Sequence, residues 1–155
     1  MEHRIRASAI VVKDNRLLLV KHQHPVTGFE WWVPPGGRLE DGETIYECAK
    51  LETYEETGLT VELGEIIYLR EFIDLENARH NLEIFILASA FEGEPAITHL
   101  IPEDLDAAYI KEVRFLSQQE MKGLTVFPEI LKDVFWQDLN SGRKPKFKYL
   151  GQQKG

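Results

Sequence analysis

The stretch from residue 36 to residue 59 constrains this chain more than any other part of the sequence. Three glycines fall within its first seven residues, Gly36, Gly37 and Gly42. Closely spaced glycines let a backbone bend tightly and approach a ligand closely. The remainder predicts a helix that begins near Glu43 or Thr44 and ends at Gly58, because glycine suits a left-handed C-cap. We therefore expect a glycine-rich turn that leads directly into a helix.

Three glutamates of that helix, Glu52, Glu55 and Glu56, fall on one of its sides, because residues three and four positions apart are neighbours on a helix surface. Carboxylates placed there repel one another, and close to the helix C-terminus the macrodipole also disfavours anions. Clustered carboxylates do supply the oxygen ligands that hard divalent cations such as Mg²⁺ prefer. The helix therefore indicates a metal site, with a solvated acidic face as the alternative interpretation.

The complete stretch resembles the Nudix box. That motif has a glycine, five residues, a glutamate, seven residues, and then Arg-Glu-apolar-x-Glu-Glu-x-Gly-apolar. The positions of this chain that match it are Gly37, Glu43, Glu52, Glu55, Glu56, Gly58 and Leu59. Two positions differ, because Leu51 stands where the family has arginine and Thr53 stands where it has a larger apolar residue.

This resemblance implies a MutT-like hydrolase that uses Mg²⁺ or Mn²⁺. The implied reaction is cleavage of a phosphoanhydride bond in a nucleoside diphosphate linked to another group X. A nucleoside triphosphate, a nucleotide sugar and an ADP-ribose type substrate all remain open. The alternative is a non-catalytic Nudix-like module that binds a nucleotide or regulates a partner, and only Leu51 favours it.

The resemblance also assigns roles within the box. Glu52 and Glu56 resemble the principal metal ligands, and Glu55 resembles a further ligand that also serves as the candidate general base. The backbone carbonyl of Gly36 resembles one more ligand, and Arg38 stands where a basic residue can hold phosphate. The implied catalytic residues are therefore Glu55, Glu52 and Arg38.

Candidate site residues also lie outside the box. Some family members take another acidic ligand from a later loop or strand, and Glu112 is the first choice here, followed by Glu103. Trp31 and Phe29 can stack on a nucleobase, since an aromatic face accepts any base, with packing in the core or a lid as the alternative. Arg6 can contact a phosphate, with ordinary solvation at a sheet edge as the alternative.

Composition limits the partners of the chain. A formal net charge of −8 argues against binding to a nucleic-acid duplex, which needs a basic surface, but it leaves a small phosphorylated substrate open. No apolar run approaches the ~20 residues of a membrane span, and no signal-peptide pattern is evident, so we expect a cytoplasmic protein. The oligomeric state is left open, with a homodimer as one option. The single cysteine, Cys48, favours a packed thiol over a nucleophile.

The order of predicted elements favours an α/β fold. Strands are expected at 5–12, 17–21, 59–72, 82–91 and 109–116, with a closing helix over 127–139. Together with the resemblance, this order implies a Nudix-like α/β/α sandwich with a mixed β-sheet. We expect one Nudix hydrolase domain over residues 1–140 and a basic, partly ordered C-terminal tail over 141–155.

Overall fold

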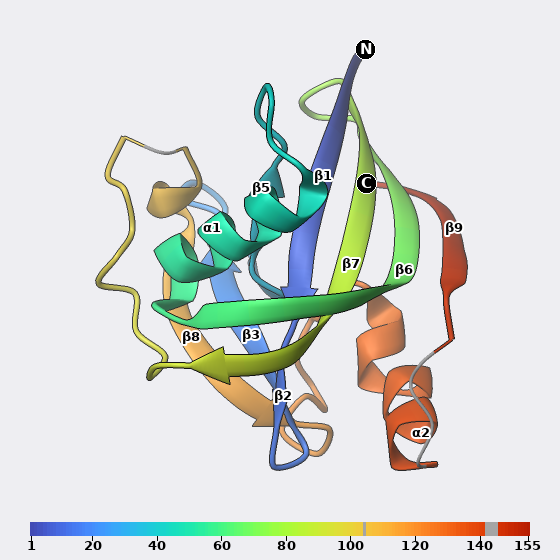
Figure 1. Cartoon of the computed structure of the whole chain (residues 1–155). Coiled ribbons are helices and arrows are strands. Elements are labelled where there is room, and N and C mark those ends of the chain that lie inside the picture. Colours follow the sequence, from blue (N-terminus) through green and yellow to red (C-terminus); the bar gives the residue numbers. More distant parts are fainter. Residues whose placement is uncertain (104, 142–145) are drawn as a thin grey trace.

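The computed structural model describes residues 1–103, 105–141 and 146–155 and contains two β-sheets and two α-helices (Figure 1). The larger sheet has five strands in the order β5-β1-β7-β6-β9. Its strands are β1 (Glu2–Ile10), β5 (Gly36–Arg38), β6 (Thr60–Asp74), β7 (Arg79–Glu92) and β9 (Lys148–Lys154). The β1–β7 and β6–β9 pairs are parallel and the other two pairs are antiparallel, so the expected mixed sheet is confirmed.

The smaller sheet is built around β3 (Arg16–Gln23), which pairs antiparallel with each of its neighbours. Those neighbours are β2 (Val12–Lys13), β4 (Glu30–Val33) and β8 (Ile110–Ser117). The largest apolar cluster combines side chains of both sheets with Phe135 and Trp136 from α2 (Val134–Asn140). Burial of these apolar side chains is the main favourable contribution to folding.

Helix α1 (Ile45–Thr57) has both ends fixed by the residues that the sequence indicates. Thr44 is the N-cap: its hydroxyl accepts from the Glu47 backbone N–H at 3.0 Å, and Glu47 Oε1 accepts from the Thr44 N–H at 3.2 Å. This reciprocal pair satisfies two donors that a helix start otherwise leaves unpaired. Gly58 ends the helix with φ +78°, in the left-handed region that favours glycine.

Helix α1 lies against the larger sheet through small residues. Cys48 and Ala49 form a buried cluster with Ala7 of β1 and Ile86 of β7. Thr53, where the family has a larger apolar residue, is fully buried, and its hydroxyl donates to the Ala49 carbonyl at 2.6 Å. The polar side chain is therefore accommodated in the interface because its hydrogen bond is satisfied within the helix.

Three elements differ from the sequence prediction. The expected glycine-rich turn begins as strand β5, because Gly36, Gly37 and Arg38 pair with β1. The expected closing helix is divided into a short 3₁₀ turn, η2 (Glu129–Lys132), and α2, because the backbone of Asp133 leaves helical geometry and its carboxylate caps the Val134 N–H. Part of the expected tail is a strand, since β9 pairs with β6 and completes the larger sheet.

The helices of the described residues are short, and none of them is long and apolar enough to cross a membrane. The longer of the two α-helices, α1, has 13 residues.

We predict that Thr44→Ala lowers the free energy of unfolding by about 1 kcal/mol, the usual cost of losing an N-cap side chain. Chemical denaturation followed by circular dichroism measures this change. Thr98→Ala, in an exposed loop, is the matched control and is expected to change stability by less than about 0.5 kcal/mol. Equal effects of the two substitutions would contradict the capping assignment.

Candidate active site

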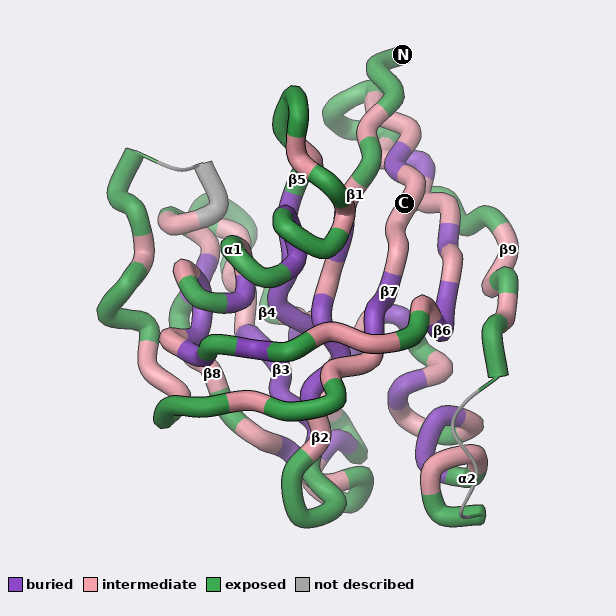
Figure 2. Tube along the Cα trace, in the orientation of Figure 1, coloured by how far each residue is buried: buried purple, intermediate pink, exposed green. Residues whose placement is uncertain are grey.

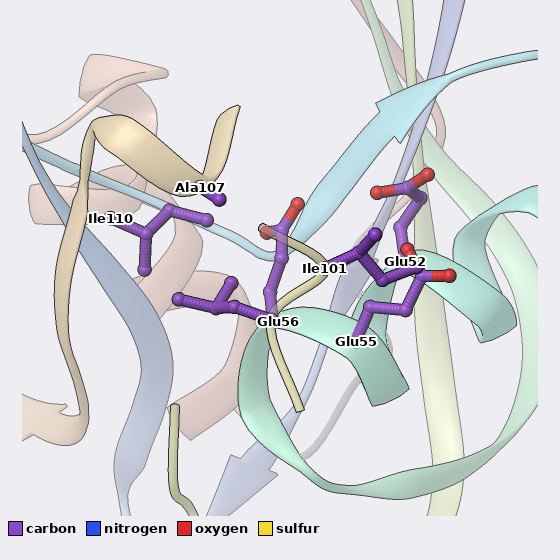
Figure 3. A pocket seen from close by; sticks show the side chains of 7 residues that line it. Glu52, Glu55, Glu56, Ile101, Ala107 and Ile110 are labelled. Atoms are coloured by element: carbon purple, nitrogen blue, oxygen red, sulfur yellow. The ribbon is translucent and has the colours of Figure 1, made fainter. Parts of the chain in front are cut away.

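Glu52, Glu55 and Glu56 line one pocket together (Figure 3). All three rise from α1, so the helical spacing seen in the sequence does bring them to one place. The opposite walls are apolar and come from the segment before β8 and from the first residue of that strand, namely Leu100, Ile101, Ala107 and Ile110. Glu52 and Glu55 are partly exposed, whereas Glu56 is only 3% exposed. A buried carboxylate is costly without polar partners, so the surroundings of Glu56 decide how the site is held.

Strand β5 supplies those surroundings. The backbone N–H of Gly36 donates to Glu56 Oε1 at 3.3 Å. A Cβ atom added at Gly37 would lie 2.5 Å from Glu52 Cδ, so only glycine leaves room for that carboxylate. A Cβ atom added at Gly36 would instead lie 2.5 Å from the Ala7 carbonyl oxygen of β1. Gly37 therefore serves close approach between β5 and α1, and Gly36 serves close approach between β5 and β1, rather than a turn.

The loop before β8 is attached to the C-terminal end of α1. The Ala96 N–H donates to the Thr57 carbonyl at 2.8 Å, and the His99 ring packs against Tyr54 with ring centroids 4.8 Å apart. These contacts place the next two residues, Leu100 and Ile101, at the pocket wall. The glutamates consequently face an apolar surface on one side, which strengthens electrostatic interactions inside the pocket.

The chemistry of the donor set suits a hard divalent cation, because three carboxylates provide oxygen ligands. Among residues 1–103, 105–141 and 146–155, no three His, Cys, Asp or Glu side chains already converge closely enough to hold a metal ion. The oxygen ligands and their location around one pocket therefore fit a magnesium or manganese site. A binding ion would have to draw the three carboxylates closer together.

Cys48 is a packed thiol and not a surface nucleophile. It is 1% exposed, and its Sγ–H lies 3.5 Å from the carbonyl oxygens of both Gly37 and Arg38. Burial, followed by the nearby charges of Glu43 and Glu52, raises the pKa of the Cys48 thiol to about 12. The side chain thus braces β5 against α1.

Other residues predicted from the sequence lie outside the glutamate pocket. Arg38 is half-exposed on β5, with its guanidinium 3.7 Å from Glu2, and Arg6 lies directly opposite it on β1. Glu112 pairs with Arg114 at 3.6 Å on β8 and does not line the pocket. Glu103 is exposed in the loop before β8.

Trp31 and Phe29 belong to a row of aromatic side chains. The Trp31 ring stacks with Phe29 at 5.7 Å and with His22 at 5.4 Å between centroids, and Tyr109 approaches it edge-on. Residues directly opposite on neighbouring strands project to the same face. Trp31 lies opposite His22, and His22 lies opposite Ile110, which lines the pocket. The aromatic row therefore continues from one wall of the glutamate pocket.

Sequence reasoning did not find His22, Tyr109 or the apolar pocket wall as members of this site. His22 and Tyr109 lie 87 positions apart along the chain, and only the β3–β8 pairing brings their strands together. The loop residues Leu100 and Ile101 follow no periodic pattern that could have placed them.

The NUDIX domain family model matches residues 2–135 of the 155 residues. The chain belongs to this family. A crystal structure of a MutT NUDIX hydrolase from Burkholderia pseudomallei is similar, with a TM-score of 0.63 and 26% identity over 77% of this chain and 87% of that one. A NUDIX hydrolase from Nitrosomonas europaea has a TM-score of 0.68 at 23% identity, covering 100% of this chain and 81% of that one, and thus shares the fold.

Two curated relatives are similar over 91 residues. An ADP-ribose pyrophosphatase from Methanocaldococcus jannaschii is 31% identical, over 58% of this chain and 53% of that protein. An oxidized purine nucleoside triphosphate hydrolase from Danio rerio is 38% identical, over 56% of this chain and 55% of that protein. The match therefore spans about half the length of these Nudix relatives.

Leu51 marks where this Nudix domain departs from its family. The side chain is 47% exposed on α1. It lines a shallow surface depression with Glu43, Glu47, Lys50, Tyr54 and Thr60. The arginine that the family pattern places here would lie among acidic side chains, whereas leucine neutralises none of them.

We predict that Cys48 resists alkylation by iodoacetamide at pH 8 in the native protein. Its raised pKa keeps the thiol neutral there, and only the thiolate is an effective nucleophile. Mass spectrometry of native and urea-unfolded protein gives the two rates, and the native rate is expected to be lower by about 100-fold or more. Comparable rates would show that the thiol is exposed.

Proposed function

We propose that this chain is a metal-dependent Nudix pyrophosphohydrolase. Its substrate is a nucleoside diphosphate linked to another group, and the bond cleaved is a phosphoanhydride. The observation that carries the proposal is the placement of Glu52, Glu55 and Glu56 around one pocket at the spacing of the Nudix box. Nudix relatives named as a pyrophosphatase and as a nucleoside triphosphate hydrolase support the same reaction class.

Glu52 and Glu56 are the proposed principal metal ligands, and Glu55 and the Gly36 carbonyl are further ligands. Nudix hydrolases generally use divalent metals, and a bound Mg²⁺ or Mn²⁺ would supply charge stabilisation at the phosphate oxygens and lower the pKa of a coordinated water. The hydrogen bond from the Gly36 N–H keeps Glu56 facing β5. Glu55, which is partly exposed, is the candidate base that receives the proton of the attacking water.

The substrate is proposed to be a nucleotide. The aromatic row offers a stacking surface next to the pocket. Phe29, at 52%, is its most exposed member, since His22, Trp31 and Tyr109 are only partly exposed. Base stacking on aromatic side chains tolerates any base, so this row supports a nucleotide without selecting which one. Arg38 is proposed to hold a phosphate, since its guanidinium is half-exposed on the strand that touches Glu52 and Glu56.

A nucleotide-binding module without catalysis is the second candidate. The observation that favours it is Leu51, because the family arginine that would pair with nearby carboxylates is missing. Against it, every glutamate of the box is retained.

We predict that Glu56→Gln lowers kcat by about 100-fold or more, as expected when a group that supports transition-state charge stabilisation is removed. The assay follows phosphate or nucleotide release with Mg²⁺ or Mn²⁺ across nucleoside triphosphates, ADP-ribose, nucleotide sugars and dinucleoside polyphosphates. Glutamine keeps an oxygen that can accept from Gly36, so the fold is expected to persist.

The matched control is Glu76→Gln, in the exposed turn between β6 and β7, which is expected to leave kcat within about twofold. Loss of turnover only in Glu56→Gln supports the hydrolase. If the native protein binds a nucleotide tightly but turns over no substrate, the proposed hydrolase activity is overturned in favour of the binding module.

We also predict that Leu51→Arg strengthens Mg²⁺ binding. An added guanidinium can pair with neighbouring carboxylates and hold them in one orientation, so less side-chain freedom is lost when Mg²⁺ binds. Isothermal titration calorimetry of both proteins at equal ionic strength measures the two affinities. Tighter binding by the native protein would contradict the idea that Leu51 leaves the carboxylates less well oriented for the ion.

A further inference from the structure

Five arginines share one face of the five-stranded sheet, although the chain has a formal net charge of −8. Strand register places Arg38 opposite Arg6, Arg6 opposite Glu83, and Glu83 opposite Arg70. Arg4 and Arg79 follow on the same side at intervals of two along β1 and β7. We call Arg4, Arg6, Arg38, Arg70 and Arg79 the arginine face. They are five of the eight arginines in the sequence.

Few carboxylates balance these charges. Glu2 alone lies near three of them, at 3.0 Å from Arg4, 3.7 Å from Arg38 and 4.0 Å from Arg79. Glu83 pairs with Arg70 at 3.0 Å. Asp74 lies opposite Arg79, but its carboxylate accepts from Asn77. Within the described residues no carboxylate forms an ion pair with Arg6, so the face carries excess positive charge.

Unpaired buried polar atoms lie on the same face. Within the described part of the chain, three buried side-chain polar atoms have no hydrogen-bond partner: Tyr68 Oη, Arg79 Nε and Asn81 Oδ1. Tyr68 is fully buried in the apolar core, where its ring contacts Phe135 of α2, so its hydroxyl lies away from the arginine face. Asn81 lies between Arg79 and Glu83 along β7, so the Arg79 and Asn81 atoms do project to the arginine face. Asn81 is 8% exposed. Buried groups of this kind are normally satisfied, and a ligand is one means of satisfying them.

Arg70 is held rigidly in the middle of the face. It is 8% exposed, its Nε donates to Gln153 Oε1 at 2.6 Å, and its Nη1 donates to Glu83 at 3.0 Å. The rings of Phe72 and Phe127 lie 5.0 Å and 5.7 Å from its guanidinium carbon. A guanidinium fixed in this way loses little side-chain freedom when it binds an anion.

Strand β5 connects the arginine face to the glutamate pocket. Gly37 contacts Glu52 on one side of the strand, and the next residue, Arg38, projects to the other side beside Arg6. β5 is the edge strand of its sheet. Figure 2 shows that β1, its neighbour, changes from buried to exposed toward its N-terminal end. Arg4 and Arg6 belong to that half of the strand and are partly exposed. The two sides of this edge strand thus face the glutamate pocket and the arginine face.

We propose that the arginine face binds the group X of the substrate and that X carries a phosphate. A phosphorylated sugar provides anionic oxygens for the arginines and hydroxyl groups that can donate to Asn81. This inference rests on the proposed function, because it assigns the part of the substrate distant from the nucleoside.

Equilibrium binding tests the inference without turnover. The 155-residue chain in EDTA is titrated calorimetrically with ADP-ribose and with ADP-ribose that carries an additional phosphate on its terminal ribose. We expect the added phosphate to tighten binding by about tenfold or more in the native protein. In the double variant Arg4→Gln/Arg6→Gln we expect the two ligands to bind within about twofold of each other.

Two further variants keep the test decisive. Arg38→Gln removes a half-exposed member of the arginine face and is expected to reduce the preference even if the double variant proves unstable. Arg114→Gln is the control, because Arg114 lies on β8 with Glu112 and Glu120 as its partners, and it should keep the full preference. No preference in the native protein, or an equal loss in Arg114→Gln, would overturn the inference.

These measurements distinguish failure of the phosphate assignment from failure of the proposed hydrolase activity. If the native protein prefers the phosphorylated ligand in EDTA but hydrolyses no substrate with Mg²⁺ or Mn²⁺, the proposed hydrolase fails and the anion site is supported. If it hydrolyses substrates but shows no preference, the hydrolase stands and the assignment of X fails. Binding of inorganic phosphate that weakens in Arg38→Gln, without any preference between the two ligands, would indicate a separate anion and would also overturn the assignment.

Discussion

The site depends on one contact, the packing of α1 against the bare backbone of β5. Glu56 is a buried carboxylate that accepts from the Gly36 N–H, and Glu52 fills the space that a side chain at Gly37 would take. The carboxylates also sit near the negative end of the α1 dipole, with no basic residue in its last turn. The repulsion among these carboxylates and with the helix dipole lowers the stability of the folded state. The capping and close packing of α1 must offset this cost.

The sequence predicted α1 and its glutamates accurately because the relevant signals are local. Thr44 and Gly58 mark the helix ends chemically, and the spacing of Glu52, Glu55 and Glu56 defines one helical face. The family resemblance added the mixed α/β architecture, which the structure and its Nudix neighbours confirm. The identities of metal ligands and substrate contacts stay predictions, because they depend on groups that bind from outside the chain.

Sequence reasoning failed where distant segments meet. It predicted a partly ordered tail over 141–155 without locating β9, because a basic stretch with Gly and Pro gives no local strand signal. The pairing of β9 with β6 and the contact of Gln153 with Arg70 come from distant segments. It named Arg6 as a candidate phosphate contact but could not add Arg70 and Arg79, whose positions follow from the β1–β7 and β6–β7 registers. The negative net charge of the chain also concealed a locally basic face.

We propose that a divalent ion binds between α1 and β5. Titration of ¹⁵N-labelled protein with Mn²⁺ tests it most directly, because a paramagnetic ion broadens nearby amide signals. Substoichiometric Mn²⁺ is predicted to broaden the amides of Gly36, Gly37 and residues 52–56 first, and excess Mg²⁺ should restore them. Broadening centred elsewhere, or none at millimolar Mn²⁺, would contradict the account.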